Sequence, residues 1–178
     1  MSTLDFSDVY QHSRLSLFSP NDQFIASVQR HRLIVRKVDN LEIVNTFACQ
    51  DAIQKIEWSY DSKLVLCGCF KRSLVHVFLI TDLNFKCRIH DPIASIVNAF
   101  WSPDSRHVVT VADFQLRYTV WSLKDRSGRY ISYPKFSDEK GYSFSKDGTL
   151  LAVLRRENCK DILSIYSIPS WDLSFENN

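Results

Sequence analysis

The chain has 178 residues, with 22 lysines and arginines against 20 aspartates and glutamates, for a formal net charge of +2. This surplus is too small to favour a nucleic-acid partner or an anionic membrane surface. Hydrophobic residues make up 45% of the chain and aromatic residues 13%, which is enough for one packed domain, and no apolar stretch approaches membrane-spanning length.

One short phrase occurs four times and organises the whole chain. In each copy an aromatic residue is followed by a serine, a turn sequence and a return to apolar or aromatic residues. The copies are Phe18–Phe24, Trp58–Leu64, Trp101–His107 and Phe144–Leu150, and their aromatic leads are spaced 40, 43 and 43 residues apart. A period in this range, carried by short strands and turn residues, predicts a WD40-type β-propeller.

Each repeat predicts four antiparallel strands. The first strand ends at the lead aromatic, and the residues after the serine form a tight turn. The second strands are apolar on both faces, as expected between neighbouring blades, and cover 24–28, 64–67, 108–111 and 150–154. The third strands cover 33–36, 75–78, 118–121 and 164–166. The fourth strands are more polar and cover 42–47, 86–89, 130–133 and 173–175.

The predicted fold class is therefore all-β, with about four blades of four antiparallel strands and almost no helix. The blades cover 13–49, 50–92, 93–135 and 136–178, and a loop over Lys124–Arg129 lies within the third. Segment 1–12 precedes them, and its residues Leu4–Tyr10 are placed where a closing outer strand would lie. Because propellers usually close with more blades, we expect an incomplete propeller whose uncovered faces favour aggregation.

The tryptophans give a prediction about the core. Trp58, Trp101 and Trp121 each end a strand that faces the next blade, so all three are expected to be largely buried. Strands near Asn98–Trp101, Val108–Val111 and Arg117–Trp121 are expected to lie side by side in one blade. The Trp171-Asp172 pair is outside the position that this dipeptide takes in the best-known WD40 pattern.

Cysteine usage favours structural thiols. The five cysteines are odd in number and mostly lie inside predicted strands, which suits a reduced cytosolic compartment. They are Cys49, Cys67, Cys69, Cys87 and Cys159. Cys67-Gly-Cys69 looks like half of a metal site, yet no second Cys or His pair follows at zinc-finger spacing. We therefore predict no metal site.

Catalytic motifs are absent from the sequence. There is no phosphate-binding glycine loop, no nucleophile elbow and no His-Glu-x-x-His. The paired carboxylates Asp138-Glu139 stand next to Lys140 and are expected in a solvated loop. We predict no catalytic residues, no cofactor and no small-molecule substrate.

Two basic features raise the possibility of an anionic ligand. Arg30, Arg32 and Arg36 alternate along a predicted strand, where the wet rim of a blade is a simpler interpretation than an anion-binding patch. Arg155-Arg156 is similar to the paired arginines of phosphoinositide-binding propellers of the autophagy type. Those arginines are set in Phe-Arg-Arg-Gly, whereas this chain has Leu154 before the pair and Glu157 after it, which argues against that function.

Several phrases together resemble the WD repeat-containing protein eight family. They are Phe18–Ser27, Ile53–Ser59, Trp101–His107, Phe114–Leu123 and Cys159–Trp171, and the likeness runs from about Phe6 to about Leu173. The resemblance implies a non-enzymatic scaffold at the centrosome or spindle pole. Such a scaffold would associate with a coiled-coil microtubule-anchoring protein, tether microtubule minus ends and help organise the mitotic spindle.

The resemblance also implies further blades beyond the four, and it transfers no partner-binding residues, because the family has no short binding motif to place here. Other functions stay open at this point. They are a phosphoinositide-binding propeller, a generic WD40 protein-interaction module and, less favoured by the charge, a nucleic-acid-associated propeller. Enzymatic function has the least support.

Overall fold

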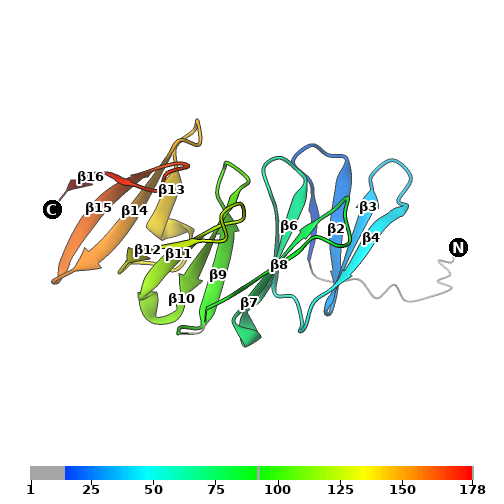
Figure 1. The fold of residues 1–178 in the computed structure, drawn as a ribbon, viewed down its shortest axis with the longest axis horizontal. Coiled ribbons are helices and arrows are strands. Elements are labelled where there is room, and N and C mark those ends of the chain that lie inside the picture. Colours follow the sequence, from blue (N-terminus) through cyan, green and yellow to red (C-terminus); the bar gives the residue numbers. More distant parts are fainter. Residues whose placement is uncertain (1–14, 92, 178) are drawn as a thin grey trace, which may run out of the picture.

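The computed structural model describes residues 15–91 and 93–177, so the predicted closing strand Leu4–Tyr10 lies outside the described residues. The described chain forms sixteen strands in four antiparallel sheets of four strands each. The sheets follow one another along the long axis of the molecule in chain order (Figure 1). Short 3-10 turns occur at Phe70–Arg72, Asp113–Gln115 and Glu139–Gly141, and the described residues contain no α-helix and hence no membrane-spanning one. The predicted WD40-type propeller fold is confirmed.

Each sheet is a blade in which consecutive strands are neighbours. Blade one contains β1 (Ser16–Phe18), β2 (Phe24–Gln29), β3 (Arg32–Lys37) and β4 (Ile43–Ala48). Blade two contains β5 (Lys55–Trp58), β6 (Leu64–Cys69), β7 (Leu74–Leu79) and β8 (Lys86–His90). Blade three contains β9 (Ile96–Trp101), β10 (His107–Ala112), β11 (Arg117–Ser122) and β12 (Gly128–Ser132). Blade four contains β13 (Tyr142–Phe144), β14 (Leu150–Glu157), β15 (Lys160–Ser167) and β16 (Leu173–Asn177).

The predicted strands agree with these bounds apart from three details. β9, β10 and β11 lie side by side, with Val108 paired to both Trp101 and Trp121, as expected. The predicted loop Lys124–Arg129 is too long, because β12 already begins at Gly128, which pairs with Trp121. The hairpin of β14 and β15 is longer than predicted, since pairing continues to Glu157 and Lys160 despite the charged side chains. Arg30 lies in the turn before β3 and is not part of that strand.

The repeated phrase forms the same turn in every blade. The residue four places after the lead aromatic has a positive φ, which is 56° at Asp22, 61° at Ser62, 57° at Ser105 and 71° at Gly148. Short polar residues and glycine tolerate this left-handed conformation better than other residues. In blades one, two and four, the serine after the lead aromatic accepts a hydrogen bond from the first backbone N–H of the second strand. Blade three is the exception, because the equivalent Ser102 hydroxyl has no hydrogen-bond partner among the described residues.

The core consists of three hydrophobic clusters, one between each pair of neighbouring blades. Trp58 and Trp101 are buried, with 6% and 1% of their surface exposed, so the prediction for them is confirmed. Trp121 is less buried than the other two tryptophans, and its partly buried side chain packs against the cluster between blades two and three. Trp171, which sequence reasoning left outside the pattern, is buried between blades three and four against His107.

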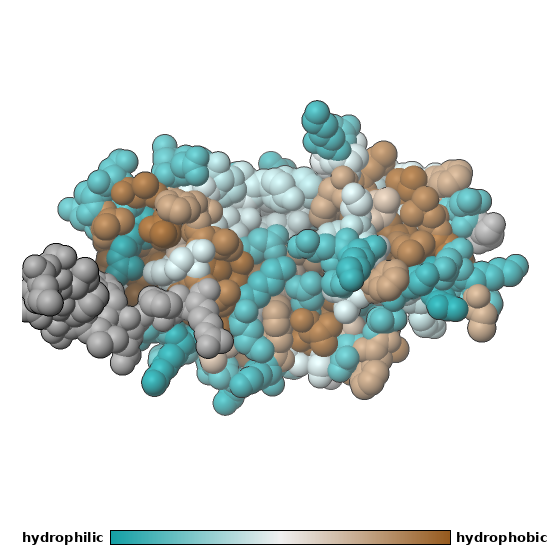
Figure 2. All heavy atoms as spheres, turned by 180° about the vertical axis from the view of Figure 1, so that it is seen from behind, coloured by the Kyte–Doolittle hydropathy of each residue, from teal (hydrophilic) through white to brown (hydrophobic). Residues whose placement is uncertain are grey.

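Both end blades expose apolar side chains to solvent. In Figure 2 apolar surface gathers over both ends of the molecule. Blade one exposes Leu17, Phe18 and Ile43, and blade four exposes Leu163, Leu173 and Phe175. Blades two and three, in contrast, have a neighbouring blade against each face, which is why their second strands are apolar on both sides.

Candidate protein-interaction groove

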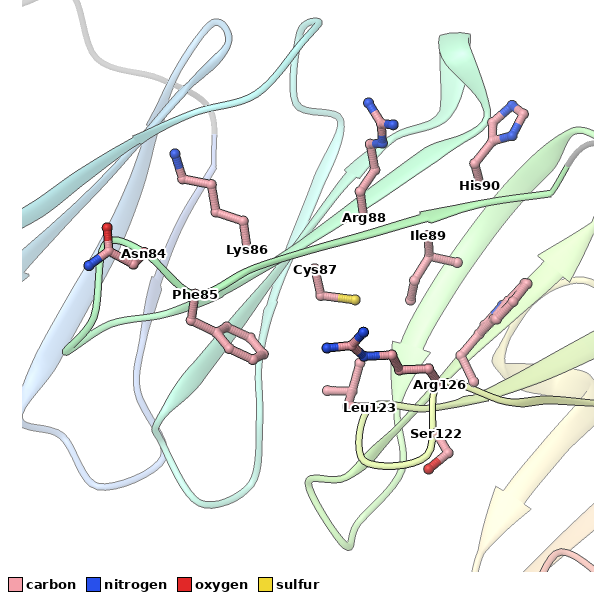
Figure 3. Close-up of a pocket in the computed structure, with 11 residues that line it drawn as sticks. Asn84, Phe85, Lys86, Cys87, Arg88, Ile89, His90, Ser122, Leu123 and Arg126 are labelled. Carbon is pink, nitrogen blue, oxygen red and sulfur yellow. The ribbon is translucent and has the colours of Figure 1, made fainter.

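A groove runs along the outer strand of blade two and faces the end of β11 and the following turn in blade three. It encloses about 740 Å³, within the size range of ligand-binding clefts. Because successive residues of a strand point to opposite sides, β8 presents alternate side chains to it. Figure 3 shows Phe85, Cys87 and Ile89 pointing toward the turn of blade three, and Lys86, Arg88 and His90 pointing away.

The floor of the groove is apolar. Ile89 is buried and Cys87 is half-buried on the β8 side, while Leu123 and the half-buried Trp121 pack from blade three. Phe85 stands at one end and is 36% exposed. The indole N–H of Trp121 donates to the Thr110 hydroxyl at 2.9 Å, which fixes the ring at the floor. An apolar, partly open floor of this kind suits side chains of another protein.

The rim of the groove is basic. Arg126 reaches across the mouth toward Cys87 (Figure 3). Burial raises the pKa of the Cys87 thiol and the nearby Arg126 guanidinium opposes that shift, so the thiol remains neutral. No carboxylate is among the residues lining the groove. Asp125 is close by in sequence, but its carboxylate accepts a hydrogen bond from the Ser122 hydroxyl at 3.1 Å.

The cations around β8 are free of ion pairs within the part of the chain that the structure describes. Nine ion pairs occur there, and none involves Lys86, Arg88 or Arg126. This contrasts with Arg117, which binds both carboxylate oxygens of Asp91 at 2.9 and 2.8 Å. Lys86 and Arg88 point away from the turn of blade three, so Arg126 is the unpaired cation that the mouth of the groove offers to an acidic partner surface.

At the loop end of the same two blades, two large apolar side chains project into solvent. Ile93 is 78% exposed and Phe114 is 85% exposed. Their loops are joined by the Asp113 N–H, which donates to the Ser95 carbonyl at 2.7 Å. Phe114 has a positive φ of 56°, a conformation that is costly for a bulky residue. Ile93 and Phe114 therefore add exposed apolar surface beyond the end of β8.

Several charged residues that the sequence singled out make hydrogen bonds within their own blade or turn. Asp138 and Glu139 are exposed in a 3-10 turn, and the Asp138 carboxylate accepts from the Lys140 N–H. Arg36 donates to the Ser27 hydroxyl at 3.2 Å. Arg155 binds Glu176 at 2.6 Å and the Ser132 carbonyl at 2.8 Å, so its guanidinium is occupied within blade four.

Sequence reasoning did not find the groove. Its residues come from two blades and belong to no motif, since each one taken singly looks like an ordinary outer-strand or turn residue. The alternation of residues 85–89 along a strand indicates which of their side chains share one face. Only the fold brings Arg126 and Leu123 opposite that face.

Comparison with known proteins agrees with the observed architecture. The chain is 40% identical over 171 residues to WD repeat-containing protein WRAP73 of Mus musculus, which covers 96% of this chain and 37% of that protein. It is 26% identical over 157 residues to an uncharacterized WD repeat-containing protein of Schizosaccharomyces pombe, with 82% of this chain and 32% of that protein covered. The chain thus spans about a third of the length of these relatives. No family model matches.

Solved structures show the fold alone. The β-propeller domain of Cps50 (Swd1) from Myceliophteria thermophila aligns over 98% of this chain and 57% of its own, with a TM-score of 0.66 and 12% identity. The dihydro-heme d1 dehydrogenase NirN aligns over 96% of this chain and 38% of its own, with a TM-score of 0.66 and 16% identity. The sequence relatives support membership of the WD-repeat family, and the structures match its β-propeller architecture.

Proposed function

We propose that this WD-repeat chain is a non-enzymatic protein-interaction scaffold that acts at the centrosome or spindle pole. The resemblance to the WD repeat-containing protein eight family motivates the location, and the WD-repeat relatives support the interaction role. In this proposal the chain supports microtubule minus-end anchoring and mitotic spindle organisation. The phosphoinositide alternative is not favoured, because Arg155 is occupied by Glu176 and by the Ser132 carbonyl.

The observation that carries the proposal is the groove between β8 and the turn after β11. Its apolar floor and the unpaired Arg126 at its mouth fit an amphipathic helix that has an apolar stripe flanked by acidic residues. A coiled-coil protein presents such helices, with charged side chains beside the apolar seam. The proposed partner is therefore a coiled-coil microtubule-anchoring protein, and Arg126 is the cation best placed to contact its acidic flank.

The first test is the location of a fluorescently tagged chain through mitosis. Accumulation at the spindle poles supports the proposal, and a uniform distribution in mitotic cells contradicts the proposed location. The matched pair of variants is Arg126→Glu, in the groove, and Lys146→Glu, on the exposed turn of blade four.

The second test is binding to a coiled-coil protein recovered with the tagged chain. We expect Arg126→Glu to weaken that binding by about tenfold, or about 1.4 kcal/mol, which is the loss expected for an interface residue that contributes measurably to binding. Lys146→Glu should leave it unchanged. Equal weakening by both variants would point to net charge rather than the groove, and no weakening by Arg126→Glu would move the partner surface elsewhere, with Ile93 and Phe114 as the next place to examine.

A further inference from the structure

A second cluster lies on the other side of blade two, in its interface with blade one. Cys49 follows β4 of blade one, Cys69 ends β6, and His76 lies in β7. One ligand atom from each of these residues lies within 4.8 Å of the other two. All three residues are buried, with 7%, 0% and 8% of their surface exposed. The fold thus gathers two thiols and an imidazole in one enclosed place.

Strand alternation explains why these side chains meet. Cys67 and Cys69 point to the same side of β6, and Cys67 pairs with His76 across the sheet. This side of blade two faces blade one, where the ring of Phe47 stacks on that of Phe78 at 4.7 Å. Cys49 follows Phe47 along the same edge, and its backbone N–H donates to the His31 carbonyl at 2.8 Å. Cys49 is thereby held opposite the cysteines of β6.

His76 has an unused ligand atom. Its Nε2 is buried and has no hydrogen-bond partner among the described residues. Burial and the nearby Arg88 guanidinium lower the pKa of His76. The Phe78 ring lies parallel to the imidazole at 5.8 Å and restricts its orientation. A buried polar atom without a partner normally costs free energy, and a bound cation would remove that cost.

Cys67 supplies a further thiol beside this group. A hydrogen bond with Cys67 and burial raise the pKa of Cys49 well above its usual range, against the opposing hydrogen bond with Cys69. The hydrogen bond with Cys49 and burial likewise raise the pKa of Cys69. The Cys49 and Cys69 thiols are close enough to act together on one ion, and the Cys67 thiol lies beside them.

We propose that Cys49, Cys69 and His76, with Cys67 as a fourth ligand, form a structural zinc site that joins blade one to blade two. Thiolate and imidazole are the ligands of structural zinc, with Zn–S near 2.3 Å and Zn–N near 2.0–2.1 Å in tetrahedral geometry. Tetrahedral Zn–S bonds of that length place two sulfurs about 3.8 Å apart. The observed separations of up to 4.8 Å among Cys49, Cys69 and His76 require only a small inward movement of these three side chains, and Cys67 has to move further to complete the tetrahedron.

Charge balance also suits the buried location. Two thiols that lose their protons to water neutralise one Zn²⁺, so the ion, Cys49, Cys69 and the neutral His76 carry no net charge. If Cys67 also loses its proton, the remaining negative charge lies near Arg88, which pairs with His76 across β7 and β8. A buried ion without such balance would be strongly disfavoured.

Motif spacing does not reveal this site, because its ligands come from two blades. A disulfide between Cys49 and Cys69 is the competing chemistry, but it would use only the two thiols and leave the His76 Nε2 without a partner. The ligands belong to the interface of two blades, so the ion would act as a clamp and raise the stability of the folded chain.

The test uses the reduced 178-residue chain, dialysed against a chelator and titrated with Zn²⁺ or Co²⁺ alone. We expect one Zn²⁺ per chain by native mass spectrometry, a Co²⁺ spectrum with thiolate charge-transfer bands, and a higher melting temperature with Zn²⁺. Cys69→Ser and His76→Asn should each weaken Zn²⁺ binding at least about 100-fold, since even residues behind the ligands change affinity 10–100-fold. Cys159→Ser changes an exposed cysteine of blade four and should leave binding unchanged.

A readout on the unmodified chain covers the case in which a ligand variant fails to fold. Zn²⁺ should protect Cys49, Cys67 and Cys69 from alkylation, while the exposed Cys159 continues to react at its original rate. Absence of zinc uptake by the reduced chain overturns the proposal, and so does uptake that leaves Cys49 and Cys69 unprotected. A Cys49–Cys69 disulfide that forms in the cell and whose reduction does not restore zinc binding also overturns it.

Discussion

The interface between blades two and three and the interface between blades three and four grow from the same repeated phrase but are held by different contacts. In the first, the Trp101 indole N–H donates to the Glu57 carbonyl at 3.1 Å, and the Ser105 hydroxyl accepts from the Asp61 N–H at 3.0 Å. Trp58 and Ser62 make the equivalent bonds to blade one. Blade four has Phe144 and Gly148 at these positions, and neither can take part.

Aromatic packing replaces the missing hydrogen bonds in the interface between blades three and four. Phe100 stacks on Tyr142 with ring centroids 4.0 Å apart, and Phe144 meets Phe100 edge-on at 6.1 Å. The Tyr118 hydroxyl donates to the Phe136 carbonyl at 2.6 Å. The shared phrase therefore builds the same turn in every blade. Two of its positions, the lead aromatic and the residue four places after it, decide how one blade is attached to the next.

The largest expected effect is at the buried lead aromatic. Trp101→Ala should lower the free energy of unfolding by about 3–5 kcal/mol, because it leaves a large cavity and removes the bond to blade two. Phe144→Ala should cost only roughly 1–2 kcal/mol, since its ring is half-buried and makes no such bond. Urea denaturation of both variants measures the difference. A Phe144→Ala variant as unstable as Trp101→Ala would show that the two interfaces do not differ as described.

Gly148→Ser tests whether the serine contact can be restored in blade four. Serine holds a similar left-handed conformation at Ser62 and Ser105, so the turn accepts a serine there in spite of the strain of a positive φ. A Cβ at position 148, however, would lie 2.9 Å from the Pro103 Cβ. We therefore expect a loss of about 1–3 kcal/mol from overpacking.

The control for this variant is the double change with Pro103→Gly, which removes the Pro103 Cβ and is measured in the same denaturation series. The double variant should lose less stability than the sum of the two single changes, because the side chains at positions 103 and 148 are in contact. Full additivity would mean that the contact with Pro103 is not what excludes serine from blade four.

The sequence was sufficient for the fold because its signals are local. Strand alternation and Ser-x-Asp turns act within a few residues, so the strands around Trp101 and Val108 could be placed from their order alone. Contacts that cross blades carry no such signal. Trp171 is buried against His107, a neighbour from the preceding blade, and Arg126 reaches the groove from the turn opposite β8. These partners are distant in sequence, so only the arrangement of the blades reveals them.

Tyr118→Phe tests the polar contact of the aromatic interface. Removing the hydroxyl leaves the Phe136 carbonyl without this donor and should cost about 1–2 kcal/mol. Tyr130→Phe is the matched control, because Tyr130 is 60% exposed and its ring, which lies under the Arg117 guanidinium, is kept. Thermal denaturation of the two variants is the measurement. Equal stability would show that the Tyr118 hydroxyl does not help to hold blade four to blade three.

The smallest expected effect compares two serines at the same place in the phrase. The Ser59 hydroxyl donates to Asp61 at 2.6 Å and accepts from the Leu64 N–H at 2.9 Å. The Ser102 hydroxyl is buried and has no hydrogen-bond partner in the described structure. The cause is Asp104, whose carboxylate binds the His107 ring at 2.6 Å and accepts from the His107 N–H at 3.2 Å.

Ser59→Ala should therefore cost about 1 kcal/mol, whereas Ser102→Ala should be neutral or slightly stabilising, because it removes a hydroxyl that is already unsatisfied. The His107→Ala background makes the comparison sharper. Without the imidazole, the Asp104 carboxylate is free to turn to Ser102 as Asp61 does to Ser59, and Ser102→Ala should then become costly. If Ser102→Ala is equally neutral in both backgrounds, His107 is not the reason that the turn of blade three differs from the other three.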